Sequence, residues 1–256
     1  MIMKKTRTER ALFVLSMVVA MVLAVPTLSS AMHIMEGYLP LNYCIIWGVI
    51  CIPFVVAGFI SIKKTIANDR KLLLILVMVA AYAFVLSALK IPSVTGSSSH
   101  PTGTGLGAIL FGPSAMCIIG LIVLLFQAIL LAHGGLTTLG ANTFSMAIAG
   151  PFVSFAVYTI CNKMKAPKSV GVFLAACLGD LFTYCVAAVQ LALAHPSQVG
   201  GFTASLVEFL GIFAITQIPL SVIEGLIAVV VMKGLESFAQ PELESLGYYG
   251  TLKAAC

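Results

Sequence analysis

A histidine at position 33 lies two residues after a candidate processing site, where it could bind a metal ion together with a new amino terminus. If the chain is cut after Ala31, Met32 supplies a free terminal amine. His33 then supplies its backbone nitrogen and its imidazole Nδ1, and these donors close two consecutive chelate rings lying nearly in one plane. Nitrogen-rich planar sites suit Ni²⁺, Cu²⁺ and, less commonly, Co²⁺. The sequence therefore predicts a transition-metal site at the mature amino terminus.

The first 31 residues contain the three parts of a secretory signal peptide. A basic start is followed by the apolar run 11–25, Pro26 ends that run, and small residues lead to the predicted cut after Ala31. The apolar run of about 15 residues is short for a membrane span. We therefore predict that residues 1–31 are a cleavable signal peptide. The alternative is an uncleaved first transmembrane helix.

The composition predicts an all-α polytopic membrane protein, because 60% of the 256 residues are hydrophobic and only 9% are charged. A short helix-like piece, 103–111, covers about half a bilayer and is either a short tilted span or a re-entrant half-helix. The longer apolar runs predict spans near 42–62, 71–90, 114–131, 142–163, 168–194 and 203–233.

The distribution of basic residues predicts the orientation of these spans. Lysines and arginines occupy the connections near 63–71 and 163–168, whereas the loops 91–104, 132–141 and 195–202 contain none. The positive-inside rule then places the mature amino terminus outside and the carboxyl terminus in the cytoplasm. Termini on opposite sides of the membrane require an odd number of spans, and the six long runs plus the short piece near 103–112 make seven. We therefore expect a seven-helix bundle at 32–236 and a short cytoplasmic tail at 237–256.

Three more histidines fall on the predicted outer face. His100 lies between Ser99 and Pro101 in a Ser- and Gly-rich loop. Taken alone, it is more readily explained as a histidine that hydrogen-bonds its own loop, but beside a terminal chelate it is the best candidate for the fourth metal donor. His133 starts a second Gly-rich loop and either orients a metal-binding imidazole or simply packs there. His195 is more readily explained as a helix C-terminal cap. Glu36 could orient an imidazole or neutralise the charge of the ion, or it could be an exposed acid at a helix start.

Acidic residues inside predicted spans usually face the bundle interior and mark a function. Asp180 and Glu224 lie within spans and could bond to a partner protein or to a buried glutamine, whereas Glu208 lies near an outer end and is expected to be solvated. The glutamines available are Gln127, Gln190 and Gln217. The seven cysteines form no CxxC pair and are expected to be packing residues.

Several motifs are absent. The chain has no G-x-x-x-x-G-K-[ST] phosphate-binding loop and no H-E-x-x-H metalloprotease motif. It also has no evident inverted repeat of the kind that builds many self-sufficient transporters. These absences argue against an ATPase, an intramembrane protease and an autonomous alternating-access carrier.

Three long motifs, in order, carry a family resemblance: MHIMEGYLP at 32–40, SSSHPTGTG at 97–105 and AHGGLTTLGAN at 132–142. They resemble the cobalt/nickel substrate-binding components of energy-coupling factor transporters, the CbiM/NikM type, over residues 32–236. The resemblance implies a seven-helix protein that captures Co²⁺ or Ni²⁺ at its outer face through Met32, His33 and His100. It also implies as partners a membrane-embedded coupling subunit, ATP-binding subunits and a small accessory membrane subunit, with no nucleic acid.

The expected function is therefore capture of Co²⁺ for an ATP-driven importer in a prokaryotic cell membrane, without enzymatic activity of its own. The cleavable signal is similar to that of the cobalt members, whose metal feeds cobalamin biosynthesis. Nickel transport is the alternative within the family. A different class, a stand-alone membrane metal facilitator or enzyme, also remains; for an enzyme, the acid nearest the site in sequence is Glu36.

Overall fold

The computed structural model describes residues 33–89, 91–92 and 98–249, so the predicted signal peptide and Met32 lie outside the described residues. The described chain is nearly all helical, apart from two-residue strands β1 (Ile91–Pro92) and β2 (Ser98–Ser99), which pair antiparallel. Its helices are α2 (Leu41–Asn68), α3 (Leu72–Ala88), α4 (Thr104–Phe111), α5 (Pro113–Leu130), α6 (Leu139–Asn142), the π-helix η2 (Thr143–Ala149), α7 (Gly150–Lys163), α8 (Lys168–Ala194), α9 (Gly201–Phe238) and α10 (Gln240–Ser245).

Among the described residues, five helical segments are long and apolar enough to cross a bilayer: α2, α5, the continuous segment Leu139–Lys163, α8 and α9. Helix α3 is apolar but has 17 residues. Helix α4 has eight residues, all buried, and rises only about 12 Å. These helices confirm the predicted all-α, multi-pass character and the short helix near 103–111. The boundary expected at 236 falls inside α9, and the segment after it contains α10.

Prolines and one glycine set several of these boundaries. Helix α2 follows Pro40, α8 follows Pro167, and α5 has Pro113 in its first turn. Proline suits the first turn because it has no N–H and its φ is already helical. Gly112, with φ of 83°, makes the sharp turn that separates α4 from α5.

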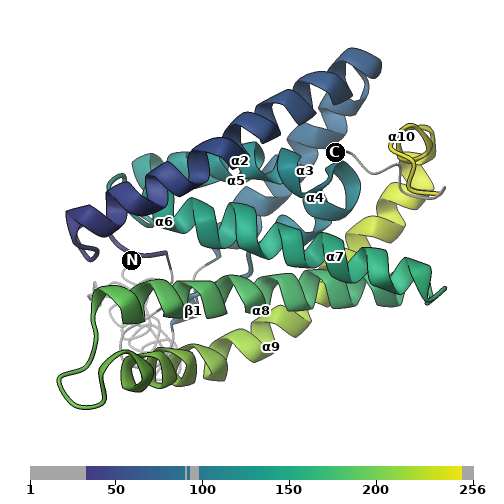
Figure 1. Cartoon of the computed structure of the whole chain (residues 1–256). Coiled ribbons are helices and arrows are strands. Elements are labelled where there is room, and N and C mark those ends of the chain that lie inside the picture. The colour runs from purple at the N-terminus through teal and green to yellow at the C-terminus, as the bar shows by residue number, and fades with distance from the viewer. Residues whose placement is uncertain (1–32, 90, 93–97, 250–256) are drawn as a thin grey trace, which may run out of the picture.

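The helices form a bundle with two distinct ends (Figure 1). Helices α8 and α9 lie side by side, α7 packs against α8, and α4 packs against α5, α7 and α8. Helix α6 and strand β1 lie at one end of the bundle, and α10 lies at the other. Large apolar side chains on α2 are exposed, including Ile45, Val49, Ile52, Val56 and Phe59. A surface of this kind is explained by contact with lipid.

Small residues allow the helices around α4 and α8 to approach closely. A Cβ added at Gly105 in α4 would lie 2.8 Å from the Cα of Ala176 in α8. A Cβ at Gly225 in α9 would lie 2.7 Å from a ring carbon of Phe173 in α8. Because apolar burial does not drive association inside lipid, such close backbone packing is a main source of helix–helix stability.

We therefore expect Gly105→Ala to destabilise the bundle by about 1–3 kcal/mol, because backbone atoms of α8 cannot move aside as a flexible side chain could. Gly211→Ala is the matched control, since a Cβ there meets nothing within 4 Å. Thermal unfolding in detergent should show a lower midpoint for Gly105→Ala and no decrease for Gly211→Ala. Equal midpoints for the two variants would contradict the packing described for α4.

Candidate metal site

Three histidines from segments far apart in the sequence meet at the α6 end of the bundle. His33 precedes α2, His100 follows β2, and His133 lies between α5 and α6. Their exposed fractions are 4%, 2% and 1%, and one potential ligand atom from each lies within 4.8 Å of the others. The ring centroids of His33 and His100 are 4.5 Å apart, and His133 lies 4.3 Å and 4.9 Å from those two rings. Histidine imidazole is a common ligand of transition metals.

The segment that carries His33 is held by side chains from the α6 region. Asn142 Oδ1 accepts a hydrogen bond from the Ile34 backbone nitrogen at 2.8 Å, and Asn142 Nδ2 donates to the Ile34 carbonyl at 3.1 Å. Thr138 Oγ1 also donates to the Ile34 carbonyl, at 2.5 Å. Asn142 therefore pairs with Ile34 much as a neighbouring strand would, and this fixes the backbone next to His33.

Two glycines let the loop 133–138 approach this segment. Gly134, with φ of 82°, would place a Cβ 3.2 Å from the Cβ of His33. A Cβ at Gly135 would lie 2.6 Å from the backbone nitrogen of Glu36. The glycine pair is therefore required by the close packing of the two segments, in addition to the positive φ at Gly134.

The loop that carries His100 is held by α8 and α9. The His100 carbonyl accepts hydrogen bonds from the Tyr184 hydroxyl at 2.5 Å and from Gln217 Nε2 at 3.4 Å. Ser99 Oγ lies 2.6 Å from Thr216 Oγ1. Non-helical backbone is tolerated at membrane depth only where such partners exist or where it lines a cavity.

The hydrogen-bond partners of two imidazoles assign their tautomers. His33 Nε2 lies 3.1 Å from the sulfur of Met146, and His100 Nδ1 lies 3.0 Å from the Pro101 carbonyl oxygen. A thioether sulfur and a carbonyl oxygen only accept hydrogen bonds, so each of these nitrogens carries the proton. In these tautomers Nδ1 of His33 and Nε2 of His100 are the unprotonated ring nitrogens, the form in which imidazole binds a metal.

A small cavity of about 10 Å³ lies against His33 and His100. The volume is about that of one water-sized sphere. Ser145, Met146, Thr183, Tyr184 and Ala187 complete its lining. Its size suits a single small ion in direct contact with the side chains around it and leaves no room for an organic ligand.

The structure places the other sequence-predicted residues around this cluster. Glu36 is exposed and accepts a hydrogen bond from the Thr137 backbone nitrogen at 3.1 Å, rather than from an imidazole. Hydrogen bonds from Thr137 lower the pKa of Glu36, and the side chain of Thr137 has a larger effect than its backbone. His195 is the C-cap residue of α8, as expected, and its Nε2 lies 2.8 Å from the Tyr38 carbonyl. Glu208 is exposed, as predicted.

The two acids expected to face the bundle interior are buried, with 1% exposed fraction each. Asp180 accepts a hydrogen bond from Gln217, one of the three glutamines proposed from the sequence. Glu224 instead accepts hydrogen bonds from the loop at Thr102 and Gly103. The other two glutamines bond elsewhere: Gln127 to Ser87 and Gln190 to the Ala141 carbonyl.

Sequence reasoning missed Met146 and Asn142, which contact His33 and Ile34. Asn142 ends the third family motif, so its position in that motif was a usable signal. Met146 lies in η2, and nothing in the sequence distinguished it from an apolar packing residue. π-helical segments occur frequently at functional sites, and here η2 brings Met146 to the histidines.

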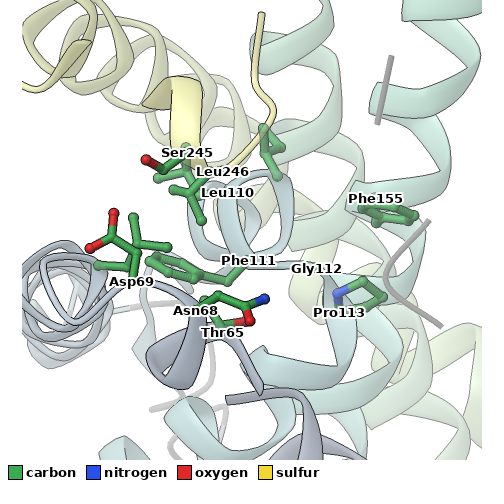
Figure 2. Close-up of a pocket in the computed structure, with 12 residues that line it drawn as sticks. Thr65, Asn68, Asp69, Leu110, Phe111, Gly112, Pro113, Phe155, Ser245 and Leu246 are labelled. Carbon is green, nitrogen blue, oxygen red and sulfur yellow. The ribbon is translucent and has the colours of Figure 1, made fainter. Parts of the chain in front are cut away.

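A larger cavity lies near α10, and none of the three histidines lines it (Figure 2). It encloses about 510 Å³ and is lined by residues from the α2–α3 turn, the α4–α5 turn and the α10 region, including Asn68, Asp69, Phe111 and Ser245. No histidine or cysteine is among its lining residues. The cavity therefore offers no nitrogen or sulfur ligand set for a transition metal.

The fold and site define a multi-pass membrane protein with a buried histidine cluster suited to a transition-metal ion. Residues 33–243 match the family model CbiM, described as the cobalt uptake substrate-specific transmembrane region, and the chain belongs to that family.

Relatives of known name and solved structures are similar to the chain over most of its length. A cobalt transport protein CbiM of Lachnoclostridium phytofermentans is 61% identical over 94% of this chain and 96% of its own length. Cobalt transport protein CbiM 2 of Pelobacter propionicus is 61% identical over 86% and 97%. A crystal structure of a transition metal transporter superimposes with a TM-score of 0.71 at 25% identity, covering 81% of this chain and 94% of that chain.

We expect Asn142→Leu to release the segment that carries His33, because leucine is of similar size but can make neither of the hydrogen bonds to Ile34. Loss of buried hydrogen bonds costs about 1–3 kcal/mol, which corresponds to roughly 5- to 150-fold faster amide exchange. Hydrogen–deuterium exchange of peptides covering residues 33–39, in metal-free protein, measures this effect. Asn68→Leu, at the opposite end, should leave these peptides unchanged; unchanged exchange in Asn142→Leu would contradict the assigned role.

Proposed function

We propose that this chain captures Co²⁺ at the outer face of a prokaryotic cell membrane, as the substrate-binding subunit of an ATP-driven energy-coupling factor importer that feeds cobalamin biosynthesis. The observation that carries the proposal is the meeting of three buried histidines, one of which is the second residue after the predicted cut. Membership of the cobalt uptake family and relatives named as cobalt transport proteins support it.

The proposed donors are the terminal amine of Met32, the backbone nitrogen and Nδ1 of His33, and Nε2 of His100. The tautomers support this set, since they leave the electron pairs on the two imidazole nitrogens that the set requires. The backbone nitrogen of His33 must lose its proton to bind the ion, so binding should weaken as the pH falls.

His133 and Glu36 have supporting roles in this proposal. His133 packs edge-on against both other imidazoles, with interplanar angles of 63° and 90°, and we assign it to holding their orientation. Glu36 holds the loop after His133 through Thr137, and so acts on the site through the packing of two segments.

Geometry, rather than raw affinity, is the proposed basis of metal selection. The Irving–Williams order places Cu²⁺ above Ni²⁺ and Co²⁺ at almost any nitrogen site. Mg²⁺ and Ca²⁺ prefer oxygen ligands and should not compete. A planar nitrogen site also suits Ni²⁺, so nickel capture by the same residues is the alternative substrate.

We place the histidine end outside because the loops at that end, 132–138 and 195–200, contain no Lys or Arg. The five long helices together with α3 and the loop-plus-α4 segment would make seven crossings in the mature chain, an odd number, as this orientation requires. In this arrangement residues 1–31 are a removed signal, 32–236 the membrane domain and 237–256 a cytoplasmic tail.

Coupling to ATP would require partner proteins, because the chain lacks a phosphate-binding loop. The proposed partners are a membrane-embedded coupling subunit, ATP-binding subunits and a small accessory membrane subunit. A stand-alone metal facilitator is the alternative of a different class. Metal uptake by cells that express this chain alone, with no coupling or ATP-binding subunit, would favour the facilitator.

The terminal chelate makes a direct prediction about processing. Amino-terminal sequencing of the mature protein should begin at Met32, and acetylation of the Met32 amine should abolish tight Co²⁺ or Ni²⁺ binding. The reason is chemical, because an acetylated amine has no basic electron pair to give to the metal. Titration calorimetry of both forms measures the effect, and equal affinity of the acetylated form would rule out the terminal chelate.

Substitution of the histidines should separate metal ligands from a supporting residue. We expect His33→Ala and His100→Ala each to abolish metal uptake while the protein still reaches the membrane. His133→Asn should lower affinity by about 10- to 100-fold, the usual cost of losing a group that orients a ligand. Uptake of radioactive cobalt and metal titration of the purified variants measure these effects.

Exposed His195 provides the matched control, and His195→Ala should bind within a few-fold of the unmodified chain. X-ray absorption of the loaded protein should show about four nitrogen neighbours and no sulfur. A strong sulfur shell would instead implicate Met146 as a ligand. Full uptake in His100→Ala would remove that loop from the site.

A further inference from the structure

The loop that carries His100 is hydrogen-bonded to a carboxylate of α9, that of Glu224. Glu224 Oε2 accepts a hydrogen bond from the Thr102 backbone nitrogen at 2.5 Å, and Oε1 accepts one from the Gly103 backbone nitrogen at 3.0 Å. The Thr102 hydroxyl donates a further bond to Oε1 at 3.1 Å. Glu224 and Thr102 are each 1% exposed, so these bonds are shielded from water.

A carboxylate matches the electrostatics of this position. Thr102 and Gly103 come directly before α4, where backbone N–H groups have no acceptor within the helix and the helix dipole is positive. An amide side chain could satisfy only one of the two N–H groups, because its NH₂ would face the other donor. Two carboxylate oxygens accept from both at once.

Two further buried residues, Gln217 and Asp180, support the backbone of His100 itself. Gln217 Nε2 donates both to the His100 carbonyl and to Asp180 Oδ2. Gln217, bonded to Asp180, therefore holds the His100 carbonyl, and Glu224 holds the next two residues, Thr102 and Gly103, after Pro101.

We propose that Glu224 is a positioning residue of the metal site, which brings His100 to the distance at which its Nε2 completes the ligand set. The segment of His33 is held separately, by Asn142 and Thr138. Loss of the Glu224 bonds should therefore withdraw His100 while the amino-terminal chelate stays in place. This inference rests on the proposed function, because it assumes that His100 is a ligand.

The test uses processed full-length protein in detergent with Ni²⁺ alone as the probe, because the absorption spectrum of Ni²⁺ reports the number of nitrogen donors. Glu224→Gln should lower the affinity at least tenfold and give the spectrum of His100→Ala. The double variant His100→Ala/Glu224→Gln should bind no more weakly than His100→Ala. Glu208→Gln is the matched control, since Glu208 lies on the same helix but is exposed, and it should leave spectrum and affinity unchanged.

The outcomes distinguish a failure of the proposed metal site from a failure of the positioning role of Glu224. If His100→Ala keeps the unmodified spectrum, the proposed metal site is wrong. If His100→Ala changes the spectrum but Glu224→Gln does not, or if the losses in the double variant add, Glu224 has only a general structural role and the inference fails. Should Glu224→Gln not fold, Thr102→Val removes one of the bonds more mildly, and an unmodified spectrum and affinity in that variant would also overturn the inference.

Discussion

Backbone polar groups at membrane depth must find hydrogen-bond partners within the protein, and the end of this structure that holds the three histidines depends on that constraint. The segment at Ile34 and the loop from His100 to Gly103 are not helical, so their N–H and C=O groups need side-chain partners. Asn142 and Thr138 satisfy the first segment. Tyr184, Gln217 and Glu224 satisfy the loop. The buried polar residues of α6, α8 and α9 are explained by this need.

These hydrogen bonds also give the site its stiffness. Each histidine comes from a segment outside the helices and strands, which by itself does not fix the position of the imidazole. Because the segments are bound to different helices, the distance between His33 and His100 is set by the packing of α6 and η2 against α8. That packing is close: η2 and α8 are in contact, and Asp180 and Gln217 connect α8 to α9. The cluster is therefore as rigid as the bundle.

Much of the site was predictable from local patterns. His33 was identified by its distance from the predicted cut, and His100 by its loop. Other features had weak local signals or none: His133 could be a loop residue or part of the site, and nothing in the sequence distinguished Met146 from an apolar packing residue. Glu224 was expected to face the interior, but its partners in the loop before α4 were not foreseen, because a backbone N–H has no sequence signature.

The sequence by itself determined where the helices lie, because a bilayer admits only long apolar segments with satisfied backbones, and prolines and Gly112 mark several of their ends. It also determined which loops lack basic residues. Only the tertiary structure decided that Asn142 meets Ile34, 108 residues away, and that Glu224 meets Thr102, 122 residues away. Such pairs depend on how rigid helices pack in three dimensions, and one polar side chain has many chemically equivalent partners along the chain until that packing selects one.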